Sequence, residues 1–184
     1  MKIFLLIIVT ILFFSCQEKS DSNKEEKLPF SVIRAKHKEE LLEWNKGLVE
    51  VDHSVIRKFI ERRKWDMQVS PTGLYYQIYL KTNGEPAING MIAEFSYKTS
   101  LLNGTVIYTS EEFGNRSLNL GHNQEESGLD EGIKMMKVGE KARFIMPPHL
   151  AFGVPGDGYK VPVYSIVVYE IELLSLSLPK EEGQ

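Results

Sequence analysis

Residues 132–174 read GIKMMKVGEKARFIMPPHLAFGVPGDGYKVPVYSIVVYEIELL, and the rest of the fold can be worked out from them. After the tight turn at Val138-Gly139, apolar and basic residues alternate over residues 141–146, which predicts a half-buried strand. A second strand is predicted over residues 163–174, with its apolar face at Val167, Tyr169, Ile171 and Leu173. A long loop rich in Gly and Pro joins the two strands, and long ordered loops are usually functional.

The composition is that of an ordinary globular protein. The chain has 184 residues, of which 42% are hydrophobic and 26% are charged, enough for one domain with appendages. Its net charge of -3 gives no basic excess that would indicate nucleic-acid binding. One cysteine and four well-separated histidines exclude an internal disulfide and a structural zinc site of the usual spacing. We therefore expect no metal, no cofactor and no nucleic-acid partner.

Residues 1–15 are predicted to be a lipoprotein signal peptide. The apolar run from Ile3 to Phe14 would reach about 18 Å as a helix, short of a hydrocarbon core of about 30 Å. The run ends at Ser15-Cys16, which resembles a bacterial lipobox, although Phe13 stands where the motif usually has Leu. Acylation of Cys16 would anchor the chain to a membrane of the cell envelope, facing the periplasm. The alternative is a plain signal peptide with an incidental cysteine.

Two segments of different character follow the signal. Residues 16–35 include the stretch QEKSDSNKEEK, which has no apolar residue, and they are expected to form a flexible tether. Residues 36–66 carry apolar residues at three- and four-residue steps, which predicts a helical extension. Gly47 weakens its middle by about 1 kcal/mol, and Asp52 or Ser54 is a candidate cap for a separate second helix. The apolar stripe either packs on the chain's own domain, which we favour, or forms an interaction or dimer surface.

Strand-like alternation dominates residues 67–178. Further strands are predicted at Leu74–Leu80, Ala93–Lys98, Thr105–Thr109 and Leu118–Leu120. The turn signal Asn103-Gly104 separates two of them. A short helix with Leu129, Ile133 and Met136 on one face precedes the turn at Val138-Gly139. The pattern predicts an α+β domain in which a short helix covers one face of a six-stranded antiparallel sheet. Residues 179–184 are expected to be a tail.

From about Gly90 to Leu174 the chain resembles the FKBP-type peptidyl-prolyl isomerases. The family's landmarks occur in order: Tyr97 at the Tyr of its VHYTG strand, Asn103-Gly104 at its DG turn, Gly128–Gly132 at GWEEG, Val138–Glu140 at VGE, Ala151–Gly153 at AYG and Val161-Pro162 at IP. The resemblance implies an FKBP-like twisted antiparallel sheet wrapped on a short helix. A lipidated chain with a helical N-terminal extension is also similar to the gliding-motility-associated isomerases of bacterial envelopes.

The resemblance also implies a cup that holds the prolyl ring of a substrate. Its catalytic positions would be Tyr97, Ile107, Tyr108, Leu129, Phe152, Val161 and Tyr169, with Glu126 and Ala151 contacting the substrate. Rotation about an Xaa-Pro bond has a barrier of about 18–20 kcal/mol and moves no proton or electron. A water-poor apolar cup disfavours the charge-separated planar amide and so eases the twist.

Several of these positions differ from the family's usual residues. The Phe-Asp pair of the family is Ile107-Tyr108 here, so the carboxylate that faces the pocket is expected to be missing. The Val-Ile pair is Glu125-Glu126, and Arg116 stands where an aromatic residue is usual. The floor Trp is Leu129, and the Tyr after Ala151 is Phe152. Because each lost hydrogen bond is worth about 0.5–1.5 kcal/mol, turnover is expected to be reduced.

Two functions therefore follow from the sequence. The first is a membrane-tethered peptidyl-prolyl cis-trans isomerase that acts on proline-containing polypeptides and assists the folding of exported proteins. The second is a catalytically weak FKBP-fold binding module or chaperone component of an envelope complex. The missing carboxylate favours the second, whereas the retained apolar floor and aromatic loop favour the first, which we prefer.

Overall fold

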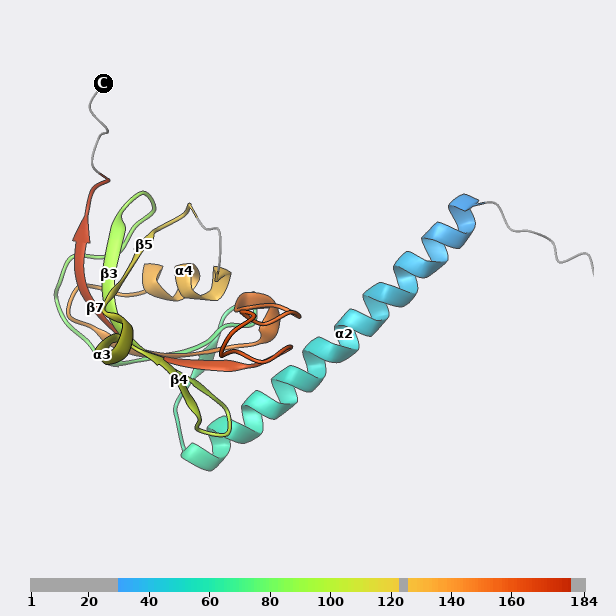
Figure 1. Cartoon of the computed structure of the whole chain (residues 1–184), viewed down its shortest axis with the longest axis horizontal. Helices are drawn as coiled ribbons and strands as arrows, with labels where there is room; N and C mark the ends of the chain where they lie inside the picture. The colour runs from blue at the N-terminus through green and yellow to red at the C-terminus, as the bar shows by residue number, and fades with distance from the viewer. Residues whose placement is uncertain (1–29, 123–125, 180–184) are drawn as a thin grey trace, which may run out of the picture. The chain divides into compact units, whose positions relative to one another are not determined.

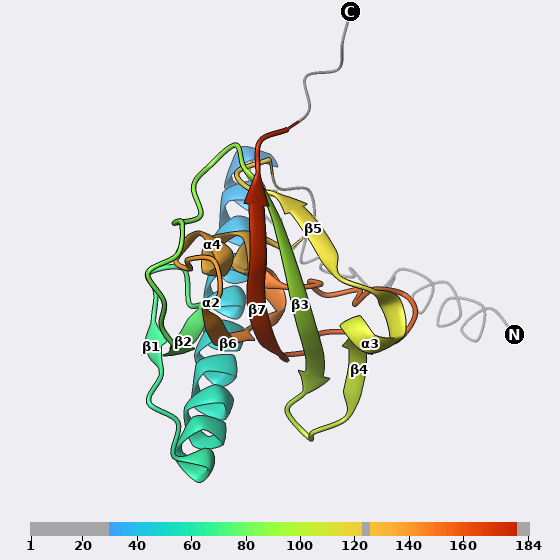
Figure 2. The same cartoon turned by 90° about the vertical axis from the view of Figure 1, so that its left-hand side faces the viewer.

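The computed structural model describes residues 30–122 and 126–179 (Figures 1 and 2). Its helices are α2 (Phe30–Arg63), α3 (Ser110–Phe113) and α4 (Ser127–Lys134), with a 3-10 turn η1 at Pro148–Leu150. Its strands are β1 (Gln68–Val69), β2 (Tyr75–Leu80), β3 (Ile92–Leu101), β4 (Val106–Thr109), β5 (Arg116–Asn119), β6 (Lys141–Met146) and β7 (Val167–Ser177). The predicted signal peptide, Cys16 and most of the predicted tether lie outside the described residues.

The strands form one antiparallel sheet in the order β1-β2-β6-β7-β3-β4, and β5 also pairs with β3. Strand β7 is central, because it pairs with β6 on one side and with β3 on the other. Its residue Ile171 lies opposite Ala142 of β6 and Tyr97 of β3. The α+β prediction is confirmed, and β1 and α3 are additional short elements that the sequence pattern had not indicated.

Helix α4 covers one face of the sheet, as Figure 1 shows. Its residues Leu129 and Ile133 are fully buried and pack in the same core as Phe144 of β6. The helix comes very close to the sheet at Gly132, where an added Cβ would lie 2.8 Å from the Phe144 ring. Only glycine allows this approach, which explains its place in the GLDEG segment.

The C-terminal part of α2 packs on the opposite face of the sheet. Because successive strand residues point to opposite faces, Ile145 of β6 faces away from α4. It lies in a second core cluster with Ile56 and Phe59 of α2, which are 0% and 2% exposed. The described residues from Glu43 onward accordingly belong to one compact unit. The favoured interpretation, that the apolar stripe packs on its own domain, is right for this part of α2.

The helix differs from its prediction in three respects. It begins at Phe30, within the predicted tether, and it runs through Asp52 and Ser54 without a break, so the candidate second helix does not form. Trp44 and Val51, which belong to the predicted stripe, remain 69% and 60% exposed. No helix in the described part of the chain is long and apolar enough to span a bilayer.

The last strand is shifted from its predicted position. It was expected over residues 163–174, but β7 runs from Val167 to Ser177. Pro162 lacks the N–H that a strand ladder needs, and Tyr164 has φ of 51°, a left-handed conformation that extended strands do not adopt. The segment from Pro147 to Ile166 is therefore a long loop, called here the β6–β7 loop.

Candidate active site

A cleft of about 320 Å³ opens beside the β6–β7 loop, on the face of the sheet that carries α4. Its lining residues come from six separate segments: Tyr97 of β3, Tyr108 of β4, Phe113 of α3, Arg116 of β5, Glu126 before α4, and Phe152 and Asp157 of the loop. Three of the predicted site residues with aromatic rings, Tyr97, Tyr108 and Phe152, thus meet here although they are far apart in sequence.

The walls of this cleft are largely aromatic. Tyr97 is 9% exposed, and its ring packs edge-on against Phe95 at a centroid distance of 6.1 Å. Tyr108 packs edge-on against Phe113 at 5.3 Å on the other side. Phe152 of the β6–β7 loop is partly buried against the core. Such rings provide flat apolar surfaces for a small ring of a ligand.

Other predicted site residues lie behind the cleft surface. Ile107, Leu129 and Val161 are 4%, 0% and 3% exposed and belong to the hydrophobic core. They support the walls without lining the cleft. Ala151 lines an adjoining hollow of about 350 Å³, together with Glu126, Phe152, Gly156 and Asp157, three of which also line the cleft.

One side of the cleft carries a buried charge network, which the expectation of an apolar cup did not include. The Glu126 carboxylate, with its side chain 3% exposed, accepts a hydrogen bond from the Tyr169 hydroxyl at 2.5 Å and from Arg116 Nη1 at 3.1 Å. Arg116 Nη1 also donates to the Tyr169 hydroxyl at 3.4 Å. Glu126 was predicted to contact substrate through its backbone N–H, which these two side-chain hydrogen bonds do not involve.

Burial and charge together set the protonation of this network. Burial raises the pKa of Tyr169 well above its usual value, and the adjacent Glu126 charge raises it further, so the hydroxyl stays a donor. Burial alone would lower the pKa of Arg116, but Glu126 and Tyr169 outweigh it and raise the pKa. The guanidinium carbon also lies 5.7 Å from the Tyr97 ring centroid, which is within cation–π range.

The carboxylate expected to be missing is supplied by a different element. Asp157, in the β6–β7 loop, accepts a hydrogen bond from the Tyr108 hydroxyl. It also accepts bonds from the N–H groups of Tyr159 at 2.9 Å and Val161 at 2.8 Å. A carboxylate therefore does line the cleft, which corrects the sequence prediction. The Gly156-Asp157-Gly158 segment offered a turn signal, but nothing local indicated that its Asp faces Tyr108.

The hydrogen bond between Asp157 and Tyr108 shifts both groups. Burial by itself disfavours the Asp157 anion, but the bonds from Tyr108 and from the backbone outweigh burial and lower the pKa of Asp157. Burial and the nearby carboxylate raise the pKa of Tyr108 to about 12. At neutral pH the cleft therefore contains a carboxylate held by a neutral phenol, and this pair fixes the loop against β4.

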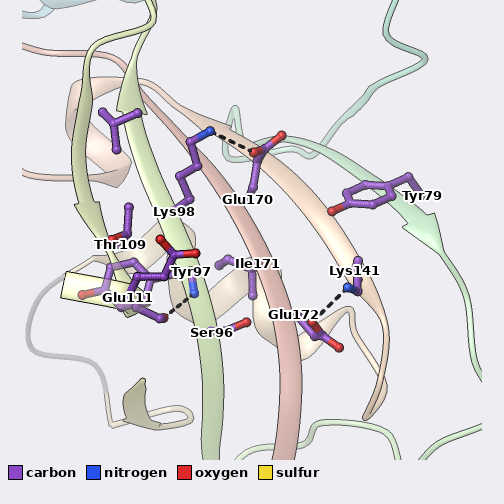
Figure 3. Close-up of a pocket in the computed structure, with 12 residues that line it drawn as sticks. Tyr79, Ser96, Tyr97, Lys98, Thr109, Glu111, Lys141, Glu170, Ile171 and Glu172 are labelled. Carbon is purple, nitrogen blue, oxygen red and sulfur yellow. Dashed lines mark hydrogen bonds and ion pairs between the residues drawn. The ribbon is translucent and has the colours of Figure 1, made fainter. Parts of the chain in front are cut away.

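A larger hollow, of about 480 Å³, lies on the face of the sheet opposite α4, called here the outer face (Figure 3). Figure 3 shows Lys98 paired with Glu170 and Lys141 paired with Glu172, at 3.9 and 3.0 Å. These are partly exposed cross-strand ion pairs, which contribute little free energy. We consider this surface a solvated face of the sheet, because its lining lacks the convergent apolar walls of the cleft.

Comparisons with known proteins agree with this arrangement. Residues 84–174 match the family model of the FKBP-type peptidyl-prolyl cis-trans isomerases. The human protein named Peptidyl-prolyl cis-trans isomerase FKBP10 is 38% identical over 104 residues, which cover 56% of this chain and 17% of that protein. The FKBP-type peptidyl-prolyl cis-trans isomerase FkpA of Aeromonas hydrophila is 30% identical over 121 residues, covering 66% of this chain and 44% of that protein. The chain thus spans less than half the length of these two relatives.

Two solved structures share the fold. FkpA from Escherichia coli superposes with a TM-score of 0.60 at 25% identity, covering 97% of this chain and 83% of that structure. AtFKBP13 superposes with a TM-score of 0.57 at 28% identity, covering 61% of this chain and 99% of that structure.

Proposed function

Because its residues 84–174 make this chain a member of the FKBP-type peptidyl-prolyl cis-trans isomerase family, we propose that it catalyses rotation about Xaa-Pro bonds in polypeptides. The observation that carries the proposal is the aromatic cleft, in which Tyr97, Tyr108 and Phe152 converge beside an ordered loop. At about 320 Å³ the cleft has room for a prolyl ring, and its walls are largely aromatic.

The chemistry required is modest. Twisting an Xaa-Pro amide removes its resonance and its charge separation, so transfer from water to an apolar cleft lowers the barrier. Tyr97 and Phe152 would form the walls for the prolyl ring. The backbone N–H groups at the start of α4, including that of Glu126, would donate hydrogen bonds to the substrate residues that flank the proline. Leu129 and Val161 keep these groups in place from behind.

A second candidate function has its own support. The Arg116–Glu126–Tyr169 network places charged groups beside the ring site, and charges there oppose burial of an apolar ring without water. A weakly catalytic binding module or chaperone component therefore remains the alternative. A rate measurement distinguishes the two, since only the isomerase accelerates exchange substantially above the uncatalysed rate.

The cellular setting is proposed from the sequence. Cys16 follows an apolar run and Ser15, which supports acylation there and an envelope lipoprotein that assists folding of exported proteins. Metabolic labelling of a bacterial host with a fatty-acid probe should mark the wild-type chain and not Cys16→Ser. An unlabelled wild type would contradict the proposed anchor.

The activity test uses a soluble fragment beginning near Leu28 and a short proline peptide followed by NMR exchange spectroscopy. We expect a rate above the uncatalysed one, with a large fall in Phe152→Ala, which removes a cleft wall. Lys98→Ala, on the outer face of the sheet, is the matched control and should be unchanged. If the wild type does not accelerate the exchange, the isomerase proposal is wrong and the binding module takes its place.

A further inference from the structure

Another hollow, of about 410 Å³, lies between α2 and the β6–β7 loop. We call it the helix–loop groove, and its lining residues are Asn45, Leu48 and Val49 of α2 with Pro148, His149, Gly153, Val154 and Tyr164 of the loop segment. None of these lining residues is a lysine, an arginine or a carboxylate. The groove is therefore suited to an apolar side chain, and its size falls in the range of about 300–1,000 Å³ usual for ligand sites.

The walls of the groove are held in place by specific contacts. The Tyr164 hydroxyl donates to the buried Asp52 carboxylate at 3.0 Å, which ties the loop to α2 across 112 positions of sequence. The Tyr164 N–H donates to the Val154 carbonyl at 3.0 Å. Tyr164 has φ of 51°, which is unfavourable for a residue with a side chain. Backbone strain of this kind persists where neighbouring contacts enforce it, and it is concentrated at ligand sites.

The helix–loop groove and the proposed active site are lined by adjacent residues of the same loop. Phe152 lines the aromatic cleft, and the next two residues, Gly153 and Val154, line the groove. Since consecutive Cα atoms are about 3.8 Å apart, Phe152 and Val154 are separated by roughly 7 Å at most. An extended polypeptide advances about 3.3 Å per residue, so a chain with its proline in the cleft reaches the groove within about three residues.

An apolar surface is exposed at this point of the loop. Val154 is 68% exposed although it borders the groove, and Val163 of the same loop is 71% exposed outside it. On α2, Leu48 and Val49 are only half-buried, so their side chains remain available to a ligand. An apolar side chain that settles between α2 and Val154 would cover surface that the fold itself leaves in water.

We propose that the helix–loop groove is a second binding subsite for the client polypeptide, which takes an apolar side chain about three residues from the proline. The proposal rests on the proposed isomerase function. It gives α2 a direct part in substrate recognition and makes the enzyme selective for proline segments with apolar flanks, which unfolded proteins expose.

The test compares two ten-residue peptides with a central Ala-Pro, one with leucines three residues before and after the proline and one with serines there. The purified full chain is used, with phosphatidylcholine nanodiscs present to accommodate its apolar residues 3–14. NMR exchange spectroscopy gives kcat/KM for each peptide, and we expect the leucine peptide to be preferred about fivefold or more.

Two variants remove the apolar lining from opposite walls. Leu48→Gln and Val154→Ser should each bring the preference close to one, without changing the rate for the serine peptide. The matched controls are Val51→Gln on the same helix and Val163→Ser on the same loop, which lie outside the groove and should keep the preference. Circular dichroism melting of each variant identifies any that fails to fold. If one groove variant is unfolded, the variant on the opposite wall tests the proposal.

The outcomes separate the two proposals. Equal rates for both peptides with wild type, or an unchanged preference in a folded groove variant, would overturn the groove subsite and leave the isomerase in place. If neither peptide is isomerised, the proposed function fails, and fluorescence anisotropy of the two labelled peptides decides the groove. Tighter binding of the leucine peptide, lost in Leu48→Gln or Val154→Ser, would support it, and equal binding would reject it.

Discussion

Glu126, Arg116 and Tyr169 give the sharpest test of the cleft's energetics. The Glu126 side chain is 3% exposed and the Arg116 side chain is 28% exposed, so each charge depends on the other for its compensation. Removing one partner of a buried pair costs about 3–5 kcal/mol. Glu126→Ile removes the carboxylate that faces the partly exposed Arg116 guanidinium, and we expect the free energy of unfolding to fall by the lower value, about 3 kcal/mol. Arg116→Phe leaves the more deeply buried carboxylate, for which we expect about 4 kcal/mol.

Replacing the whole network should have a different effect. In the triple variant Arg116→Phe, Glu126→Ile, Tyr169→Phe, both charges of the pair and the Tyr169 hydroxyl are removed together, and the volume is filled by apolar groups. Buried ion pairs can be replaced in this way at little or no cost. We expect a free energy of unfolding within about 1 kcal/mol of wild type, hence strong non-additivity. Isomerase activity should rise, because the cleft loses the charge pair of Arg116 and Glu126.

Urea unfolding of the fragment from Leu28 measures these free energies, and the peptide assay measures the activity. In a thermal melt of the same variants, a loss of about 3 kcal/mol should appear as a fall in Tm of roughly 6–12 °C for a domain of this size. Single variants as stable as wild type would refute the buried network. A triple variant destabilised by the sum of its parts would show that the charges contribute net stability, and unchanged activity would show that they do not limit turnover.

Three further predictions follow from other contacts. The bonds that lower the pKa of Asp157 stabilise the fold above the unfolded-state pKa of about 3.9, and this stabilisation is lost as pH falls through the lower folded pKa. Asp157→Asn should therefore be less stable than wild type at pH 7 by urea unfolding, and the difference should shrink as the pH is lowered into the acid range. A fragment of residues 67–178 lacks Ile56 and Phe59, whose burial is worth about 2–3 kcal/mol each. It should therefore unfold at a lower urea concentration than a fragment of residues 43–178. Equal urea midpoints would show that α2 does not stabilise the sheet. Phe152→Tyr adds a hydroxyl at the cleft, and we expect a modest gain in kcat/KM on the short peptide, whereas a loss would show that the ring position tolerates no donor.

The periodic elements of this protein were predictable because they depend on neighbours in sequence. The alternation at Ala142, Phe144 and Met146 and the Asn103-Gly104 turn express local stereochemistry and binary patterning. The glycines at 128 and 132 are needed where α4 meets the sheet, and the sequence showed them in a recognisable GLDEG segment. From these features alone the α+β class and the order of the strands along the chain could be inferred.

Only the tertiary structure decided what meets in the cleft. Asp157 faces Tyr108, and Glu126 meets Arg116 and Tyr169, because sheet register and loop closure bring together residues that are 10 to 53 positions apart. No periodicity encodes such meetings. The same holds for α2, whose apolar positions show that one face is buried but not against which partner; packing selected Ile56 and Phe59 and left Trp44 and Val51 in water. Burial, unlike helix formation, depends on the shape of a surface assembled from distant segments.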